Sequence, residues 1–359
     1  MAAVPQRLVA WLALSAAQAV HAVSLTRADA WQKPWAILEG RRPRKARYCL
    51  HFNHSWDDVT CEHLGWPRAN RSRRIIDAFA YNGESEIYEA RRRELASVIN
   101  GTAFVTTALN FKGVERKPPI PPTGENVKHS LIEKEVFDDC IFPENQTMDR
   151  ECACTVTKNS VADVVEQFNL DPEDWVLFSD PDEIPNRAVV RLLRECEVPA
   201  GPGYKKLVVH LDAQYHYYYD LRCHNNFSKW DFKNHKTPAA VKVKTMRSFG
   251  LRVLQAARAP ACVRIGTYNS CTRWLRNRTM YLPCAAWHLT GFGGPDALKT
   301  KLRDNVDWNG HFNASIYNNC TIDHPWRSLT ETPHVQYPEI PHSVQEDPER
   351  FKLFYESVA

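Results

Sequence analysis

Residues 174–185 read DWVLFSDPDEIP, a short apolar run that opens into a dense group of acids. The run 175–178 predicts a strand, and a strand buried on both faces has no side available for charge. We therefore expect Asp180, Asp182 and Glu183 to follow the carboxyl end of that strand. Ligands of open α/β sheets bind at that edge.

The acids of this turn admit two interpretations. Asp180 and Asp182 stand one residue apart, so both can point the same way and hold a hard divalent cation through oxygen. Such a cation, Mg²⁺ or Mn²⁺, would bind a diphosphate and offset the charge on a departing nucleotide. In the alternative, Asp182 caps a helix over 183–196 and the other acids are merely solvated.

The preceding segments predict an α/β fold. Residues 74–81 (RIIDAFAY) read as a strand, 84–97 as a helix with acids early and bases late, and 103–109 as a second strand. Strand, helix and strand at this spacing form a βαβ unit, whose crossover implies a parallel pair.

The remaining elements are less regular. Residues 118–154 predict a proline-rich loop followed by a disulfide-tied excursion, and 161–168 a short helix. After the helix expected over 183–196, residues 206–219 read as an aromatic-rich strand.

Composition places the chain among globular proteins. It has 359 residues, of which 43% are apolar and 11% aromatic, enough for a sizeable core. The net charge of +4 is too small to argue for a nucleic-acid partner. We expect a stem over 23–72 and one folded domain over 73–359.

The amino terminus predicts entry into the secretory pathway. Arg7 precedes an apolar run over 8–20, and Val20-His21-Ala22 fits a cleavage site, so we expect a signal peptide over 1–22. In the alternative, residues 8–25 form a signal anchor that associates the chain with a membrane.

Two further features agree with an oxidising, lumenal compartment. Eight acceptor sequons for N-glycosylation occur, at Asn53, Asn70, Asn100, Asn145, Asn226, Asn277, Asn313 and Asn319. There are eleven cysteines and no paired CxxC framework, which favours disulfides over zinc. Cys49 and Cys61 are close enough in sequence to close a small loop, and the odd count leaves at least one thiol free or paired with another chain.

Four stretches, in their order and rough spacing, resemble one family. They are RRIIDAFAYNGESEIYEARRREL (73–95), DWVLFSDPDEIP (174–185), AAWHLTGFGG (285–294) and YPEIPHSVQEDPERFKLF (337–354). The family is that of β-1,4-mannosyl-glycoprotein 4-β-N-acetylglucosaminyltransferase, also called N-acetylglucosaminyltransferase III. The similarity extends over most of residues 73–355.

The resemblance implies a GT-A-like, Rossmann-type α/β/α sandwich with a mainly parallel sheet. It also implies inverting transfer of N-acetylglucosamine from UDP-N-acetylglucosamine to a mannose of a glycoprotein N-glycan, in the Golgi lumen. On that model Asp180 and Asp182 are the DxD pair that holds Mn²⁺ or Mg²⁺ on the donor diphosphate.

Further site residues follow from the same model. His288 offers an imidazole to complete the metal's coordination, and Trp287 beside it a surface for sugar or base, although packing is the common use of such a pair. Asp77, Asn82 and Glu84 would lie where such folds receive the nucleoside. For Glu84 the alternative is a first-turn acid of the helix.

Inverting transfer also needs a base that takes the proton of the acceptor hydroxyl. The candidates are Glu183, Asp296 and Asp307, with Asp212 and Asp304 as further acids. Lys301, together with Lys299 and Arg303, would neutralise the diphosphate or form a solvated helix face.

The sequence departs from the family pattern at three places. Val105-Thr106-Thr107 stands where a Val-Glu-Ser-like strand end is expected, Asp307 and Asn309 replace an expected His and Glu, and residues 118–154 have no counterpart.

Another donor sugar or acceptor is therefore the nearest alternative function. A secreted carbohydrate-binding protein without turnover is a second, but it has no evident need for a paired-acid metal site. A hydrolase is a third, although glycosidase acids stand farther apart than one turn allows.

Overall fold

The computed structural model describes residues 56–110, 113–142, 147–199, 208–217, 238–249, 251, 278–290, 327–328 and 341–352. All of them belong to one compact unit, Ile37–Ala359. The expected signal peptide and most of the expected stem lie outside these ranges. None of the helices within them has the length and apolar character needed to cross a bilayer.

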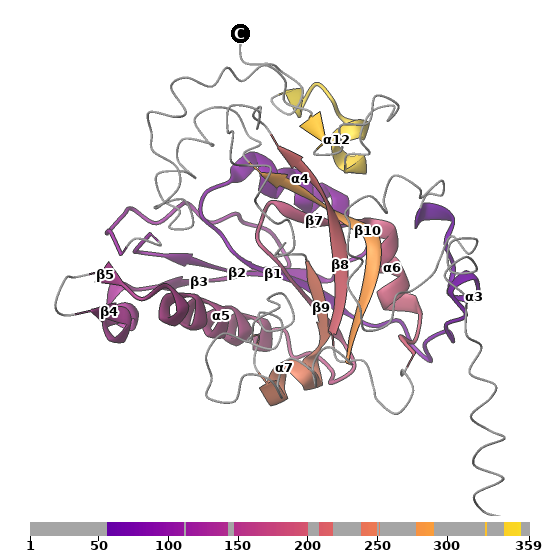
Figure 1. Ribbon diagram of the computed structural model, residues 1–359, viewed down its shortest axis with the longest axis horizontal. Helices are drawn as coiled ribbons and strands as arrows, with labels where there is room; N and C mark the ends of the chain where they lie inside the picture. The colour runs from indigo at the N-terminus through magenta and orange to yellow at the C-terminus, as the bar shows by residue number, and fades with distance from the viewer. Residues whose placement is uncertain are drawn as a thin grey trace, which may run out of the picture. The chain divides into compact units, whose positions relative to one another are not determined.

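Within the described residues a nine-stranded sheet forms the centre of the fold (Figure 1). Its strands are β1 (Ile75–Ala80), β2 (Gly101–Thr107), β3 (Val127–Ile132), β6 (Trp175–Phe178), β7 (Glu183–Pro185), β8 (Val208–Tyr217), β9 (Ala239–Lys242), β10 (Thr279–Thr290) and β11 (Arg327–Ser328). The order is β3-β2-β1-β6-β9-β8-β10-β7, and β11 pairs with β8. The neighbours β3, β2, β1 and β6 are parallel. The α/β class and the parallel βαβ unit are therefore confirmed.

Helices cover both faces of the parallel strands, with α4 (Ser85–Leu95) on one side and α5 (Arg150–Glu166) on the other (Figure 1). The pleat explains this, because successive side chains of a strand point to opposite faces. In β1, Ile76 and Ala78 belong to the core cluster that contains the apolar residues of α5. Phe79, on the other face, packs with Tyr88 of α4. This is the expected α/β/α layering.

Helix α5 is longer than the predicted helix over 161–168. It begins at Arg150, and its first half carries polar and β-branched residues that disfavour a helix by propensity. Tertiary contacts compensate, because Ala153 and Thr157 are buried and Ala153 belongs to the core cluster that contains Ile76 of β1. Packing therefore overrides the local preference.

The segment before α5 is the expected disulfide-tied excursion. A disulfide joins Cys140 to Cys152, twelve residues apart. Between them lie the short antiparallel strands β4 (Ile141–Phe142) and β5 (Thr147–Met148). The 3-10 helix η4 (Lys134–Cys140) leads into this bridge.

The helix expected over 183–196 is shorter and begins later. Residues Glu183–Pro185 form β7, antiparallel to β10, and α6 spans Arg187–Glu195. The cap of α6 is Asn186, whose side-chain oxygen accepts from the Ala188 N–H at 2.8 Å. The interpretation of Asp182 as a helix cap is therefore wrong.

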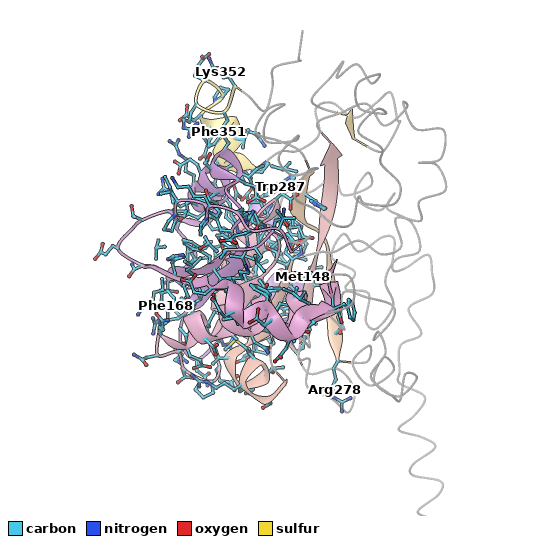
Figure 2. All side chains as sticks on the ribbon, turned by 90° about the vertical axis from the view of Figure 1, so that its left-hand side faces the viewer. Met148, Phe168, Arg278, Trp287, Phe351 and Lys352 are labelled. Carbon is cyan, nitrogen blue, oxygen red and sulfur yellow. A yellow bond between two sulfur atoms is a disulfide. The ribbon has the colours of Figure 1, made fainter. Side chains whose placement is uncertain are left out.

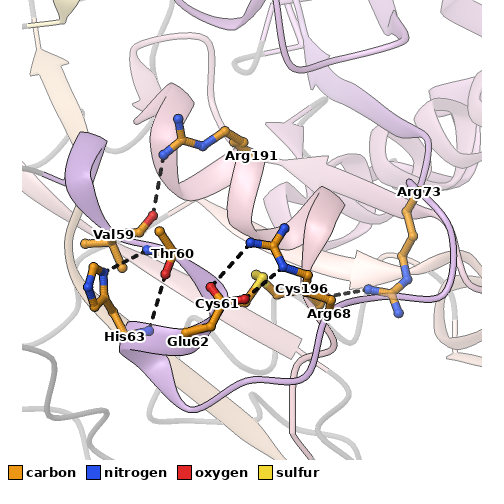
Figure 3. Close-up of a disulfide and its surroundings, with 9 residues drawn as sticks. All are labelled: Val59, Thr60, Cys61, Glu62, His63, Arg68, Arg73, Arg191 and Cys196. Carbon is orange, nitrogen blue, oxygen red and sulfur yellow. Dashed lines mark hydrogen bonds and ion pairs between the residues drawn. A yellow bond between two sulfur atoms is a disulfide. The ribbon is translucent and has the colours of Figure 1, made fainter.

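The folded unit also begins earlier than residue 73. The 3-10 helix η3 (Trp56–Asp58) and α3 (Cys61–Leu64) precede β1, and Trp56, Val59 and Trp66 are buried. A disulfide joins Cys61 to Cys196 at the end of α6 (Figure 3). The expected stem is thus shorter at its carboxyl end, and the small loop expected from Cys49 to Cys61 is excluded because Cys61 has another partner.

Candidate active site

The acidic turn lies at the carboxyl edge of the parallel strands, as expected. Strands β1, β2 and β6 run in one direction, so the residues that follow them meet at one edge of the sheet. Asp180 is half-buried, while Asp182 is 5% exposed and Glu183 is fully buried. Acids placed so deep are kept only where a partner or a bound cation compensates their charge.

His288 is brought to this turn by sheet pairing. In the register of β7 and β10, His288 stands opposite Glu183, and the Leu289 N–H donates to the Asp182 carbonyl at 2.8 Å. The His288 Nε2 atom lies 3.3 Å from the Asp182 Oδ2 atom. The structure therefore joins two of the three metal ligands expected from the sequence.

The pair offers ligand atoms of the kinds that bind divalent cations. Two neighbouring ligands at about 2.1 Å from an octahedral ion lie about 3 Å apart, close to the observed separation. Oxygen with imidazole nitrogen suits Mn²⁺, and carboxylate oxygen suits Mg²⁺. Among the described residues no group of three His, Cys, Asp or Glu side chains has metal-binding geometry. A cation here would need further ligands beyond this pair, such as water.

Glu183 turns back onto the turn itself. Its Oε2 atom accepts from the Asp180 N–H at 3.1 Å, and the residue is fully buried. A general base has to reach the acceptor hydroxyl. This position fits a residue that holds the turn better than it fits the base expected from the sequence.

Asp77 occupies a different place from the expected nucleoside contact. It is 2% exposed, and its two carboxylate oxygens accept from Arg91 at 2.7 and 2.6 Å. The side chain projects from the middle of β1 towards α4 rather than from the exit of the strand. Its partner Arg91 is not immediately evident from the sequence, which is why Asp77 was expected near the ligand.

Asn82 and Glu84 do lie at the exit of β1. The Asn82 N–H donates to Glu84 Oε2 at 3.0 Å, and the Asn82 Oδ1 atom accepts from Arg116 Nη2 at 2.9 Å. Arg116 Nη2 also donates to the Thr107 hydroxyl at 2.9 Å, so one guanidinium joins the exits of β1 and β2. Arg116 was not expected at this site, since a single arginine in a loop carries no sequence pattern.

Trp287 faces protein. It is 4% exposed, and its ring packs edge-on against His342 with centroids 5.8 Å apart. The structure therefore agrees with a packing role for Trp287 rather than with contact to a sugar or base.

Seven other expected or considered residues lie outside the described ranges: Asp296, Lys299, Lys301, Arg303, Asp304, Asp307 and Asn309. Of Asp212 only the backbone, within β8, is described.

His342 begins α12 (His342–Glu346), which packs beside α4 near the carboxyl terminus (Figure 1). Its Nδ1 lies 3.0 Å from Glu94 of α4, and its Nε2 lies 3.1 Å from Asp57 of η3. Farther along, Phe351 (labelled in Figure 2) packs against the guanidinium of Arg93 at 5.5 Å. The described part of the final stretch is thus held against α4 and η3 through a histidine between two acids.

The contacts of His342 with Glu94 and Asp57 predict that the stability of the protein depends on pH. The hydrogen bond to Glu94 raises the pKa of His342 above its usual 6.5, opposed by burial and by Arg187 and aided by Asp57. Because the pKa of His342 is higher in the folded protein than in the unfolded one, its contribution to the unfolding free energy is complete at pH values below the unfolded-state pKa. The contribution is lost as the pH rises through the folded-state pKa. We expect His342→Gln to lower the unfolding free energy by about 2 kcal/mol at pH 6. Denaturant unfolding should show a smaller loss at pH 8.5, and an equal loss at both values would exclude a charged His342.

Comparison with known proteins identifies the family. The model of glycosyltransferase family 17 matches residues 8–251, more than half of the chain. Two of the four stretches that carry the resemblance, 73–95 and 174–185, lie inside this match, and the other two lie beyond it.

Other comparisons add little. No curated protein sequence matches the chain. A solved structure described as the WbbM bifunctional glycosyltransferase in its apo form is 11% identical, with a TM-score of 0.27, over 60% of this chain and 39% of that one. A similarity this low carries no structural argument. On its sequence, the chain belongs to glycosyltransferase family 17, the family of β-1,4-mannosyl-glycoprotein 4-β-N-acetylglucosaminyltransferase, and is a glycosyltransferase.

Proposed function

We propose that this glycosyltransferase uses a divalent cation, Mn²⁺ or Mg²⁺, to transfer N-acetylglucosamine from UDP-N-acetylglucosamine to a mannose of a glycoprotein N-glycan. The observation that supports the cation is the 3.3 Å approach of His288 Nε2 to Asp182 Oδ2 at the carboxyl edge of the sheet. Membership of the family supports this choice of donor and acceptor.

In this proposal Asp182 and His288 hold the cation. Asp180, in the same turn, adds a negative charge that attracts it. When bound, the cation neutralises the diphosphate of the departing nucleotide. Glu183 keeps the turn in shape through its bond to the Asp180 N–H. An inverting transfer then needs a base on the opposite face of the sugar, and Asp296 and Asp307 remain the candidates for it.

The donor would lie along the exits of the parallel strands. Asn82 and Glu84 remain the candidates for contact with the nucleoside, and Arg116 between them and Thr107 adds a cation at that edge. Lys301 remains a candidate for the diphosphate. The two disulfides among the described residues suit a lumenal enzyme of the secretory pathway, and the family supports the Golgi lumen as its location.

Another donor sugar is the second candidate. Its support is the end of β2, where the neutral hydroxyl of Thr106 replaces the expected carboxylate and lies with its Oγ1 3.0 Å from His129 Nε2. Loss of a carboxylate at a strand exit changes which sugar hydroxyls can be hydrogen-bonded there.

The test is nucleotide release by the purified full chain, with and without Mn²⁺, across a panel of UDP- and GDP-sugars and an N-glycan acceptor mixture. We expect Mn²⁺-dependent UDP release from UDP-N-acetylglucosamine and a product heavier by one N-acetylhexosamine. Release from another sugar nucleotide would select the second candidate. A folded protein that is silent with every donor would refute both.

A further inference from the structure

Arg91 is a buried guanidinium in the middle of α4. Its side chain is 1% exposed and packs 5.0 Å from the centre of the Phe79 ring. Its Nε donates to one oxygen of Asp77 at 2.7 Å, and its Nη2 donates to the other at 2.6 Å. A paired, bidentate geometry is what makes a buried arginine tolerable.

The other N–H groups of Arg91 bind the acidic turn. Its Nη2 donates to the Ser179 hydroxyl at 2.7 Å. Its Nη1 donates to three main-chain carbonyls, those of Asp180 at 2.9 Å, Pro181 at 3.3 Å and Glu183 at 2.7 Å. All three nitrogens of the guanidinium are thus engaged, and the turn is held mainly by its backbone.

Two more bonds complete this arrangement. The Asp182 carbonyl accepts from the Leu289 N–H at 2.8 Å, and the Ser179 hydroxyl donates to the Glu183 carbonyl at 3.1 Å. Each carbonyl from 180 to 183 therefore has a donor. Because the backbone conformation determines where a side chain projects, these bonds also determine the directions of the Asp180 and Asp182 carboxylates.

Asp77 has an electrostatic part in the same arrangement. A single buried guanidinium next to the acids would repel a divalent cation, and in the interior such repulsion is weakly screened. Paired with Asp77, Arg91 supplies rigid donors without adding net charge. Two charged residues in the core are otherwise costly, so a requirement of the neighbouring site explains their presence.

We propose that Arg91 and Asp77 are positioning residues that hold the acidic turn in the geometry that binds the cation. This inference rests on the proposed function, because it presumes that Asp182 and His288 bind the cation. It assigns Asp77 to support of the metal site rather than to the nucleoside.

The experiment measures Mn²⁺ affinity by calorimetry on folded full-length protein, apart from any transfer activity. Arg91→Lys keeps the charge but loses the planar fork, and Asp77→Asn keeps the shape but leaves the guanidinium uncompensated. We expect both to weaken Mn²⁺ binding by about 10- to 100-fold, as other outer-shell changes do. The milder Ser179→Ala, which removes one acceptor of Arg91, should weaken it by a smaller factor.

Arg73→Lys is the matched control. Arg73 is also buried, at 3% exposed, donates to the Cys196 carbonyl at 2.6 Å and pairs with Glu197, but it precedes β1 at the opposite end of the strand. The Arg73→Lys variant should have lower thermal stability, but its Mn²⁺ affinity should stay within about twofold of that of the wild type.

The outcomes separate the two proposals. If wild type binds Mn²⁺ and the three site variants bind it as well as Arg73→Lys does, the positioning role is refuted and the metal site stands. If wild type binds no Mn²⁺, the metal site and the positioning role both fall. Should Arg91→Lys and Asp77→Asn not fold, the affinity of Ser179→Ala decides, and an affinity equal to wild type overturns the inference.

Discussion

Asp182→Asn should abolish Mn²⁺-dependent transfer, lowering the rate by about 100-fold or more. Changes to residues that only support a metal's ligands already lower metal affinity or activity by about 10- to 100-fold. This change removes a charged ligand itself. Folding should survive, because asparagine has nearly the same volume and the main-chain bond from Leu289 to the residue 182 carbonyl does not depend on the carboxylate. The measurement is the transfer rate against Mn²⁺ concentration, with thermal unfolding as the check on structure.

Asp171→Asn is the control for this variant. Asp171 precedes β6, at the end of the strand away from the acidic turn, and its exposed carboxylate pairs with Arg71 at 2.8 Å. An exposed ion pair contributes at most about 1 kcal/mol, so activity should be unchanged. Wild-type rates in Asp182→Asn would remove the acidic turn from the mechanism.

Removal of the Cys61–Cys196 disulfide should give the largest loss of stability. The two cysteines are 135 residues apart, and the bridge ties the segment before β1 to the end of α6 (Figure 3). On the chain-entropy model, closing a loop of this length lowers the entropy of the unfolded chain by an amount that contributes about 5 kcal/mol. We expect Cys61→Ser/Cys196→Ser to lose about 4–5 kcal/mol in guanidinium unfolding.

The second disulfide supplies the comparison. Cys140 and Cys152 are only 12 residues apart, so the same model gives about 3 kcal/mol for Cys140→Ser/Cys152→Ser. The order of the two losses is the sharper test, because both double variants exchange the same atoms. Equal losses, or the opposite order, would show that loop length does not govern the stabilisation here.

Much of the parallel half of the sheet could be predicted from the sequence. The strand over 175–178 was predicted with the bounds of β6, and the βαβ unit matches β1, α4 and β2. These elements are short, continuous in sequence and bounded by polar or glycine-containing turns, so local pattern suffices. The edge at which the acids lie followed from strand direction alone.

Arg91 did leave a signal that could have been used. The buried residues of α4 include Ile87, Tyr88, Arg91, Glu94 and Leu95, a helical stripe that contains two charges. A charged residue on such a stripe implies a buried partner. Asp77, within an otherwise apolar strand, has the opposite charge to Arg91, so the two could have been paired before the structure was known.

The sequence by itself determined the fold class, the parallel βαβ core and the place of Asp180, Asp182 and Glu183. Only the tertiary structure decided that Glu183–Pro185 is a strand rather than a helix, that Cys61 bonds to Cys196, and that His288 lies beside Asp182. The physical reason is common to all three. Each depends on contacts between segments about a hundred or more residues apart, where local propensity is silent and the pairing of strands and helices chooses the partner.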